Sequence, residues 1–554
     1  MRYDIVGYGV FEDMKGYKMK IYESVTVGQI LERSAAQVPD KIAVVDGAKR
    51  KTYSELNSMA NALAVSLAEI GLKKGDRVAI YMPNSFELMV AFYAMQKLGV
   101  IVAWVNPIYR KTEARFILKN SEARAAFIFS NWDERNFHVD ILSLRNELPD
   151  LEFIFAVGDD KSQGLYSFYD LVNRGMDKTF TSVAIDPKKD LAMLLYTSGT
   201  TGKPKGAMIT HYAVARAGWE YSIGVQASSE DIFIGFLPMS HSYGCGSILI
   251  QPILLQATVV LMDKFEAEKA FQLIEHEKIT LQLGAPPHYI LELNHTNRSE
   301  YDLSSLRAGL IAGMIAPEGL IRRVENEMGI YLTSFWGASE VGPGLGTMCP
   351  YPSPLELREQ YIGQPVADTR MRVVDPITHQ ELQDGEMGEL TLTGWHVMQG
   401  YWKNPAETRK QIIDGWLHMG DLASRDKNGY MKIYGRTKDL INRGGYKVYP
   451  HELECMLVDH PKVEQVCIVA TPNPVLGESI CACVIPRPGH AVSLEEIREI
   501  MQDQIAPHKL PDELCIMEDF PKLSGGVKIK KFGEGGLAEL ARKDEKRERI
   551  RKKG

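Results

Sequence analysis

Cysteine is scarce in this sequence and is not arranged for metal or disulfide chemistry. The chain has 7 cysteines among 554 residues, an odd number without any paired CxxC spacing. Zinc sites and disulfide frameworks depend on closely spaced or evenly paired cysteines. The sequence therefore predicts neither kind of site, and it favours a reducing cytoplasm as the location of the protein.

The sequence also lacks a basic excess and a long apolar segment. Its formal net charge is −7, whereas proteins that bind nucleic acids usually carry a basic surplus. The most apolar region, 231–262, is interrupted by Asp231, Pro238, His241 and Gln251, and the N-terminus has no apolar core of the signal-peptide kind. We therefore expect buried strands in 231–262, no integral membrane association and no nucleic-acid partner.

Short apolar runs alternate with amphipathic helical patterns over most of the chain. The run 77–82 follows a helical pattern at 53–70, and the run 281–286 follows another at 267–279. Strand, helix, strand repeats of this kind predict an α/β fold with parallel sheets covered by helices. A chain of 554 residues also exceeds the roughly 100–200 residues of one ordinary domain, so we expect at least two.

The composition and pattern of the sequence change around 434–450. A charged stretch with two adjacent glycines precedes a compact segment with its own helical and strand patterns. We place a domain boundary here. The prediction is a large N-terminal domain, 1–436, and a small mobile α+β domain, 437–554, with a hinge at Lys438. The basic tail, 539–554, is expected to form a charged, frayed helix.

The stretch YTSGTTGKPKGAMITH, residues 196–211, combines hydroxyls, glycines and lysines between two apolar runs. We expect LAMLLYT to form a buried strand and GAMIT to resume a strand after the loop. Hydroxyls, free backbone N–H groups and an ammonium group suit phosphate oxygens. The stretch is not a Walker A motif, because Pro204 replaces the expected Ser or Thr and a strand follows. Its composition alone fits a flexible surface loop equally well.

The order of several motifs along the chain carries a resemblance to a known family. They are TSGTTGKPKG, FLPMSHSYG, SFWGASEVGP, GWLHMGDLASRD, YGRTKDLINRGGYKVYPHELE and FPKLSGGVKIKK. From residue 26 to residue 531 the chain resembles the adenylate-forming superfamily, which includes acyl- and aryl-CoA ligases, peptide-synthetase adenylation domains and beetle luciferases. The resemblance implies a distorted barrel subdomain in the large domain. It also implies that a carboxylate attacks the α-phosphate of ATP and that a thiol then displaces AMP from the acyl-adenylate.

The resemblance implies a phosphate and metal site around the first of these motifs. Glu340 would bind a Mg²⁺ ion that bridges the phosphates of ATP, together with Thr200, because this hard cation prefers oxygen ligands. The residues expected to hold the β- and γ-phosphates are Thr197, Ser198, Gly199, Thr200, Thr201, Gly202 and Lys203.

For the nucleoside, Trp336 stands where the family usually has a tyrosine stacked on adenine, and Ser339 replaces a threonine. Asp421 would accept hydrogen bonds from both ribose hydroxyls, which suits an acceptor-only carboxylate. Met419 departs from the family's usual threonine, so its contact is not carried over. Arg436 would add charge near the ribose or a phosphate, or form a structural salt bridge instead.

Lys528 is the expected catalytic lysine, bridging the substrate carboxylate and the α-phosphate. The family usually has glycine directly before this lysine, whereas Val527 intervenes here. Lys530 and Lys531 therefore remain competitors. Ile529 favours Lys528, because an apolar residue follows the family's lysine.

The resemblance implies that the small domain rotates about Lys438 between the two half-reactions. Gly444 and Gly445 would then approach the thiol of coenzyme A, because the absence of a side chain lets the backbone come close to a ligand. No carrier-protein segment follows the small domain, which favours free CoA as the acceptor. The sequence leaves open whether the chain forms a homo-oligomer.

His241 stands where acyl- and aryl-CoA ligases have a gate between the acyl pocket and the thiol tunnel. The motif around it, PMSHSYG, lacks the aspartate with which amino-acid-activating relatives bind the substrate ammonium group. An apolar acid is therefore expected. Phe335 would shorten the pocket, because many relatives that accept elongated aryl acids have glycine there, and the neighbouring Ser334, Gly313 and Met314 are too small or flexible to compensate fully. Gly337, in the same motif as Trp336, is expected among the nucleotide-binding residues.

The leading prediction is an AMP-forming acyl-CoA ligase for a compact alicyclic, aromatic or medium-chain acid, with ATP, Mg²⁺ and CoA. One alternative is a stand-alone enzyme that charges a separate carrier protein. Another is a luciferase-like oxygenase. A catalytically silent nucleotide-binding regulator would lack Lys528, Glu340 or Asp421, and none of these is missing.

Overall fold

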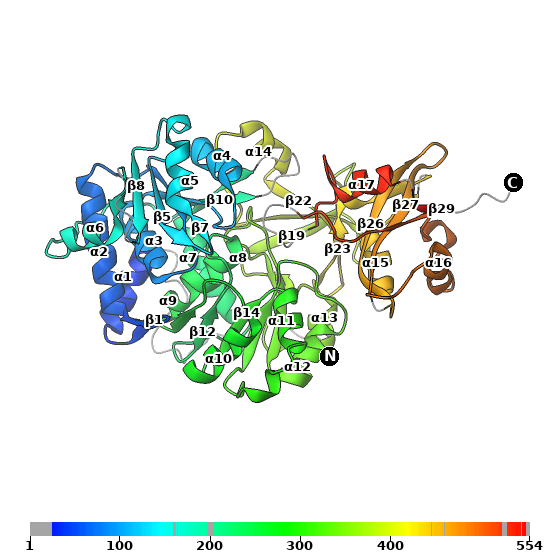
Figure 1. The fold of residues 1–554 in the computed structure, drawn as a ribbon, viewed down its shortest axis with the longest axis horizontal. Helices are drawn as coiled ribbons and strands as arrows, with labels where there is room; N and C mark the ends of the chain where they lie inside the picture. Colours follow the sequence, from blue (N-terminus) through cyan, green and yellow to red (C-terminus); the bar gives the residue numbers. More distant parts are fainter. Residues whose placement is uncertain are drawn as a thin grey trace.

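The structure is a computed structural model, and it describes residues 25–158, 162, 164–197, 204–444, 446–458, 460–522, 529–544 and 546–549. A large body of sheets and helices forms most of the molecule, and a smaller body containing α15–α17 projects from one side (Figure 1). The expected α/β class is confirmed by parallel strands in both main sheets.

The first main sheet has seven strands, and six of them run parallel. Its edge strand β11 is antiparallel to β10. In spatial order the strands are β11 (Lys205–Thr210), β10 (Leu191–Thr197), β4 (Ile101–Trp104), β3 (Arg77–Tyr81), β5 (Ala125–Phe129), β8 (Phe153–Val157) and β9 (Tyr166–Ser167). A separate hairpin joins β6 (Asn131–Trp132) and β7 (Arg135–Asn136).

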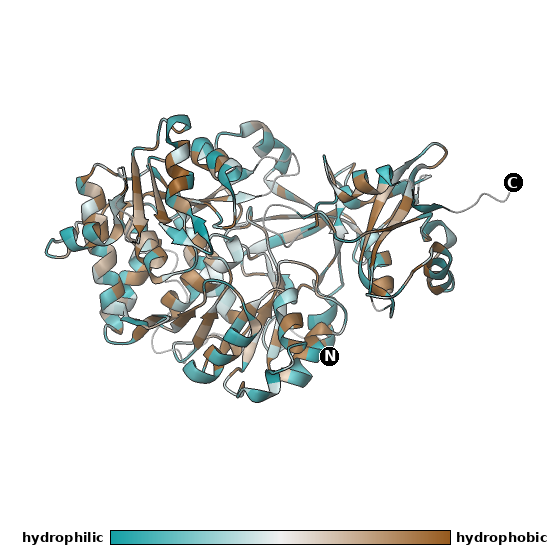
Figure 2. Cartoon of the chain, in the orientation of Figure 1, coloured by the Kyte–Doolittle hydropathy of each residue, from teal (hydrophilic) through white to brown (hydrophobic). Residues whose placement is uncertain are grey.

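The second main sheet has nine strands, with six parallel neighbours at its centre and antiparallel strands at both edges. In spatial order they are β18 (Gln364–Pro365), β17 (Thr347–Met348), β16 (Tyr331–Trp336), β15 (Ala308–Ile311), β14 (Leu281–Gly284), β12 (Ile232–Gly235), β13 (Thr258–Leu261), β1 (Ile42–Asp46) and β2 (Lys49–Thr52). Brown, apolar strands lie inside teal-faced helices in the large body (Figure 2), as burial of parallel sheets requires.

Several helices of the large body begin where the sequence supplies a side-chain cap. The predicted helix 53–70 is α2 (Tyr53–Glu69), whose capping box joins Thr52 and Glu55, and the predicted helix 267–279 is α10 (Ala267–Glu277). All 13 residues of α3 (Phe86–Leu98) are buried, because a helix without a polar face must lie inside the core. The other helices of this body are α1 (Val27–Gln37), α4 (Lys111–Ser121), α5 (Phe137–Leu144), α6 (Phe168–Gly175), α7 (His211–Ile223), α11 (Pro286–Leu293), α12 (Leu320–Met328), α13 (Leu355–Gln360) and α14 (Pro405–Gln411).

The expectation of buried strands in 231–262 is only partly right. Strands β12 and β13 lie at its ends, but the middle is helical: α8 (Ser242–Gly244), a π-helix (Cys245–Ile250) and α9 (Gln251–Leu255). A continuous apolar run does not distinguish a buried strand from a buried helix. Across the described ranges, no helix is long and apolar enough to span a membrane.

A third, antiparallel sheet connects the large body to the small one. It contains β19 (Thr369–Val374), β20 (Gly388–Gly394), β22 (Trp416–Arg425), β21 (Ile412–Ile413) and β23 (Met431–Arg436). Most of its buried apolar side chains, among them Leu390, Leu417 and Met431, belong to the same core cluster as residues of both main sheets. A second cluster lies between the first main sheet and the helices α4 and α5. The third sheet is therefore packed into the main core of the large body.

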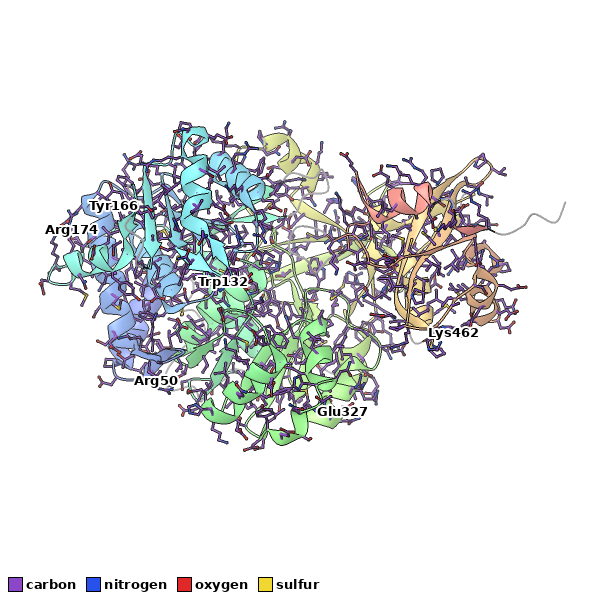
Figure 3. All side chains as sticks on the ribbon, viewed as in Figure 1. Arg50, Trp132, Tyr166, Arg174, Glu327 and Lys462 are labelled. Carbon is purple, nitrogen blue, oxygen red and sulfur yellow. The ribbon has the colours of Figure 1, made fainter. Side chains whose placement is uncertain are left out.

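The small body has its own sheet and its own core. The strands are β25 (Tyr446–Val448), β24 (Ile441–Arg443), β27 (Gly477–Pro486), β28 (Glu513–Ile516), β29 (Glu548–Arg549) and β26 (Val463–Asn473), and the helices are α15 (Pro450–Val458), α16 (Leu494–Gln502) and α17 (Leu537–Lys543). The expected helix in the basic tail is shorter than predicted, because α17 ends at Lys543 and a short strand follows. Charged side chains such as Arg50 and Glu327 on the large body and Lys462 on the small one lie at the periphery (Figure 3).

Candidate active site

The phosphate motif lies between two paired strands. Thr197, the last residue of β10, pairs with Lys205, the first residue of β11, so the two strands form a hairpin. The predicted strands LAMLLYT and GAMIT are therefore present. The predicted phosphate ligands Ser198, Gly199, Thr200, Thr201, Gly202 and Lys203 lie outside the described residues.

The proposed metal carboxylate is held beside this hairpin by a tyrosine. Tyr401 Oη donates to Glu340 Oε1 at 2.8 Å, and Tyr401 itself is only 4% exposed. Burial and the Glu340 carboxylate both raise the pKa of Tyr401, so it stays a neutral donor. The backbone of Tyr401 pairs with Ala207 of β11, and Lys205 Nζ lies 5.1 Å from the centre of the tyrosine ring. The segment of Tyr401, whose hydroxyl binds Glu340, thus packs against β11 of the hairpin.

The residues predicted to bind the nucleoside, Trp336, Asp421 and Arg436, lie together. Trp336 Nε1 donates to Asp421 Oδ2 at 3.0 Å, and Arg436 Nε lies 2.6 Å from Asp421 Oδ1. Asp421 and Arg436 are direct neighbours across β22 and β23. The three side chains therefore form one cluster around Asp421, which is 5% exposed. The salt bridge named above as the alternative role of Arg436 is present.

Phe335 points away from this cluster. Successive residues of a strand face opposite sides of a sheet, and Phe335 packs edge-on against Tyr243 and Tyr221, with ring centroids 4.7 and 5.3 Å away. Tyr243 belongs to the predicted acyl-pocket motif. Its hydroxyl donates to the Leu310 carbonyl at 3.1 Å, and the Tyr221 hydroxyl donates to the Pro343 carbonyl, also at 3.1 Å. These bonds fix the orientation of two rings that pack against Phe335.

His241 lines a small cavity at the end of β10. Its Nδ1 accepts a hydrogen bond from the Tyr243 backbone N–H at 3.3 Å, which orients the imidazole. The cavity has a volume of about 30 Å³. Its lining residues are Trp104, Asn106, Tyr109, Leu195, Tyr196, Ser240, His241, Ser242 and Ser339. The structure thus brings the predicted gate and Ser339 of the nucleotide motif to one cavity.

The other glycines and the methionine predicted for the site follow neighbouring strands. Gly313 and Met314 come just after β15, which pairs with β16, the strand of Phe335. Gly313 has φ +91°, a conformation that favours glycine, and Met314 is 47% exposed. Gly337 is required by packing, because an added Cβ would lie 1.8 Å from the Gly344 carbonyl oxygen.

The predicted hinge lies in a short turn between the two bodies. Lys438 is in the 3₁₀ turn Thr437–Asp439, directly after β23, and its side chain is exposed. Gly444 has φ +61° and donates its backbone N–H to the Leu476 carbonyl at 2.7 Å. Gly445 lies outside the described residues.

Lys528 also lies outside the described residues, but its two competitors do not. Lys530 Nζ donates to the Glu534 carbonyl at 2.6 Å. Lys531 Nζ donates to Glu454 Oε1 at 2.9 Å, and its ion pair is mostly buried. Both competitors are therefore engaged within the small body, and the choice of Lys528 stays a prediction.

Sequence reasoning missed two features. Tyr401 carries no signal, because 61 residues separate it from Glu340. Four of the cysteines lie close together in the small body. Cys467 stands opposite Cys483, and Cys483 opposite Cys515, on adjacent strands of the sheet. Cys481 lies in the same buried cluster. The alternation of Cys481 and Cys483 could have indicated a shared strand face.

Lys438→Pro is expected to slow thioester formation by about 10-fold or more while affecting adenylation less. Proline fixes φ, and under the predicted two-step mechanism only the thioester step requires the rotated small domain. Single-turnover measurements that follow acyl-adenylate and thioester separately would check this. Lys438→Ala, which leaves the backbone free to rotate, serves as the control. Equal losses in both steps would place the hinge elsewhere.

Comparison with known proteins gives consistent matches over most of the chain. A family model described as AMP-binding enzyme matches residues 31–402, and one described as AMP-binding enzyme C-terminal domain matches residues 452–526. The medium-chain fatty-acid–CoA ligase of Escherichia coli (strain K12) is 34% identical over 506 residues, covering 90% of this chain and 88% of the relative. The long-chain-fatty-acid–CoA ligase of Bacillus subtilis (strain 168) is 30% identical over 528 residues, covering 90% and 92%.

Solved structures share the fold as well. The crystal structure of the anthranilate CoA ligase AuaEII in complex with anthranoyl-AMP superposes with a TM-score of 0.82 at 26% identity. The match covers 91% of this chain and 95% of that one. The similarity thus extends through both bodies of the molecule.

Proposed function

The chain belongs to the AMP-binding enzyme family and is an AMP-forming acyl-CoA ligase that joins a carboxylic acid to CoA with ATP, and from this premise we propose that its substrate is a compact apolar acid. Alicyclic, aromatic and medium-chain acids fall within this class. The observation that carries the proposal is the packing of Phe335 against Tyr243 and Tyr221.

These three rings belong to the expected acyl side of the site. All are at most 5% exposed, and both tyrosine hydroxyls are bonded to backbone carbonyls. Bulky rings held in this way shorten the space available to an acyl chain. Substrates that extend beyond the rings must displace buried side chains, which costs free energy in a close-packed interior.

For the nucleotide, the proposal is that Trp336 stacks on adenine, Asp421 binds the ribose and the segment 197–203 binds the phosphates. The clustering of Trp336, Asp421 and Arg436 supports a common nucleoside site. Arg436 supplies positive charge beside it. Lys528 would meet the charge that develops between the carboxylate and the α-phosphate, where a preorganised donor is most effective.

A magnesium ion fits the residues of this site. Among the residues described, no group of three or more His, Cys, Asp or Glu side chains could hold a metal by itself. Mg²⁺ in nucleotide sites is commonly held by one or two carboxylates and the substrate phosphates. Glu340, held by Tyr401 beside the phosphate hairpin, would be that carboxylate, with Thr200 as a further ligand. When bound, the ion neutralises phosphate charge.

For the second half-reaction, the proposal assigns His241 to the gate between acid and thiol, and Gly444 and Gly445 to the approach of CoA. Free CoA is the proposed acceptor, and the cytoplasm is the proposed location. A separate carrier protein is the alternative acceptor. The hinge at Lys438 and a large domain ending at Arg436 are parts of the same proposal.

The proposal is tested by a panel of acids assayed with ATP, Mg²⁺ and CoA. We expect ATP–pyrophosphate exchange and thioester formation with benzoate, cyclohexanecarboxylate and octanoate, and chelation of Mg²⁺ should abolish both. The turnover should be supported by CoA alone. Exchange without thioester would indicate a carrier protein as the acceptor, and a lack of exchange with every acid would refute the proposed function.

A further inference from the structure

The edge of the Trp336 ring contacts the carboxylate assigned to the ribose, while its face is assigned to adenine. We propose that Trp336 is a positioning residue for Asp421: its indole N–H orients the carboxylate so that it binds the two hydroxyls of a ribose. The hydrogen bond is 3.0 Å long, from Nε1 to Oδ2. A phenylalanine ring has no such donor.

The indole is fixed where it is by its surroundings. The Trp336 backbone N–H donates to Thr347 Oγ1 at 3.2 Å, and its carbonyl accepts from the Gly346 N–H at 2.8 Å. A Cβ added to Gly346 would lie 2.6 Å from Cζ3 of the ring. The chain therefore packs its backbone directly against the indole, which limits the ring to one orientation.

The carboxylate is held from both sides. Arg436 Nε lies 2.6 Å from Oδ1, opposite the oxygen that accepts from Trp336. Two donors on different oxygens fix the rotation of the carboxylate plane. A carboxylate can accept about four hydrogen bonds, and the proposal assigns the ribose hydroxyls to Asp421 in addition to these two donors. A buried acceptor fixed before the ligand arrives binds more tightly than one that must be ordered on binding.

The inference rests on the proposed assignment of Asp421 to ribose, and its test does not depend on the acid. Binding of AMP and of 2′,3′-dideoxy-AMP is measured by calorimetry. The dissociation constant of 2′,3′-dideoxy-AMP divided by that of AMP reports how much the two hydroxyls contribute to binding. Replacing Trp336 also weakens stacking on adenine, but that loss affects both ligands equally and cancels in the ratio.

Trp336→Phe is expected to lower this ratio about 10-fold, the scale of a hydrogen bond to a charged group. In an Asp421→Ala background the same substitution should leave the ratio unchanged. Trp395→Phe is the matched control, because Trp395 donates its indole N–H to the Ala367 carbonyl at 2.9 Å instead, and the ratio should stay at its wild-type value.

An unchanged ratio in Trp336→Phe, with both ligands weakened alike, would overturn the inference and leave Trp336 as a stacking surface only. A wild-type ratio near one would overturn it by removing Asp421 from the ribose site, while the acid panel would still decide the proposed ligase function. If Trp336→Phe does not fold, benzothienylalanine at position 336 keeps the bicyclic ring and replaces only the N–H, and the same ratio applies.

Discussion

Lys528→Ala is expected to lower the rate of adenylation by about 10² to 10³, the scale of losing one preorganised charge donor. The substitution should spare thioester formation from a supplied acyl-adenylate, because the bond between the carboxylate and the α-phosphate is then already formed. ATP–pyrophosphate exchange measures the first step, and thioester release from the acyl-adenylate measures the second.

The neighbouring lysines provide the controls. Burial opposes ionisation of Glu454, yet His451 and Lys531 beside it lower its pKa to about 2. Lys531→Ala should therefore destabilise the small body by about 2 kcal/mol, because it removes a charged hydrogen-bond donor from a largely buried carboxylate. Lys530→Ala should change little. If either variant instead shows the selective loss of adenylation, Lys528 is not the catalytic lysine.

Phe335→Gly is expected to reverse the preference for compact acids. The wild-type protein should prefer benzoate or a cyclohexane-type acid over cinnamate-like and long-chain acids. Each methylene gained or lost in an apolar pocket changes discrimination by roughly 1–3 kcal/mol. Removing the benzyl side chain should raise kcat/KM for longer acids and lower it for compact ones.

The control for this experiment is Phe335→Leu, which keeps most of the bulk and should keep the preference. Because Phe335 is buried in an aromatic cluster, its removal should also lower the free energy of unfolding, on the order of 3–5 kcal/mol. Thermal unfolding must therefore accompany the kinetics. A wild-type enzyme that already prefers dodecanoate or coumarate would show that Phe335 does not limit the pocket.

The strands and long helices could be predicted because their signals are local. The capping box at Thr52 and Glu55 and the apolar run of β10 determine their own elements. The helical middle of 231–262 could not, since burial removes the polar face that gives a helix its period. Here tertiary packing, not the pattern, decides between strand and helix.

The candidate site was predictable only where one motif contains the residue. Glu340, Asp421 and Trp336 each stand in a recognisable segment, but their contacts with one another and with Tyr401 span from 61 to 85 residues of sequence. No periodicity predicts such a contact. Phe335 is likewise assigned to the acyl side from its motif, but its contacts with Tyr221 and Tyr243 could be seen only in the structure.

The hydrophobic clusters of the large body and those of the small body are separate, which has a consequence for synthesis and for recombination of the gene. The described members of the large core end at Met431, and those of the small cores begin at Ile441. During synthesis the nucleotide-binding part can fold on the ribosome before the lysine-bearing segment is translated, because domains fold as units from the N-terminus. Recombination at this junction could likewise exchange one module without repacking the other.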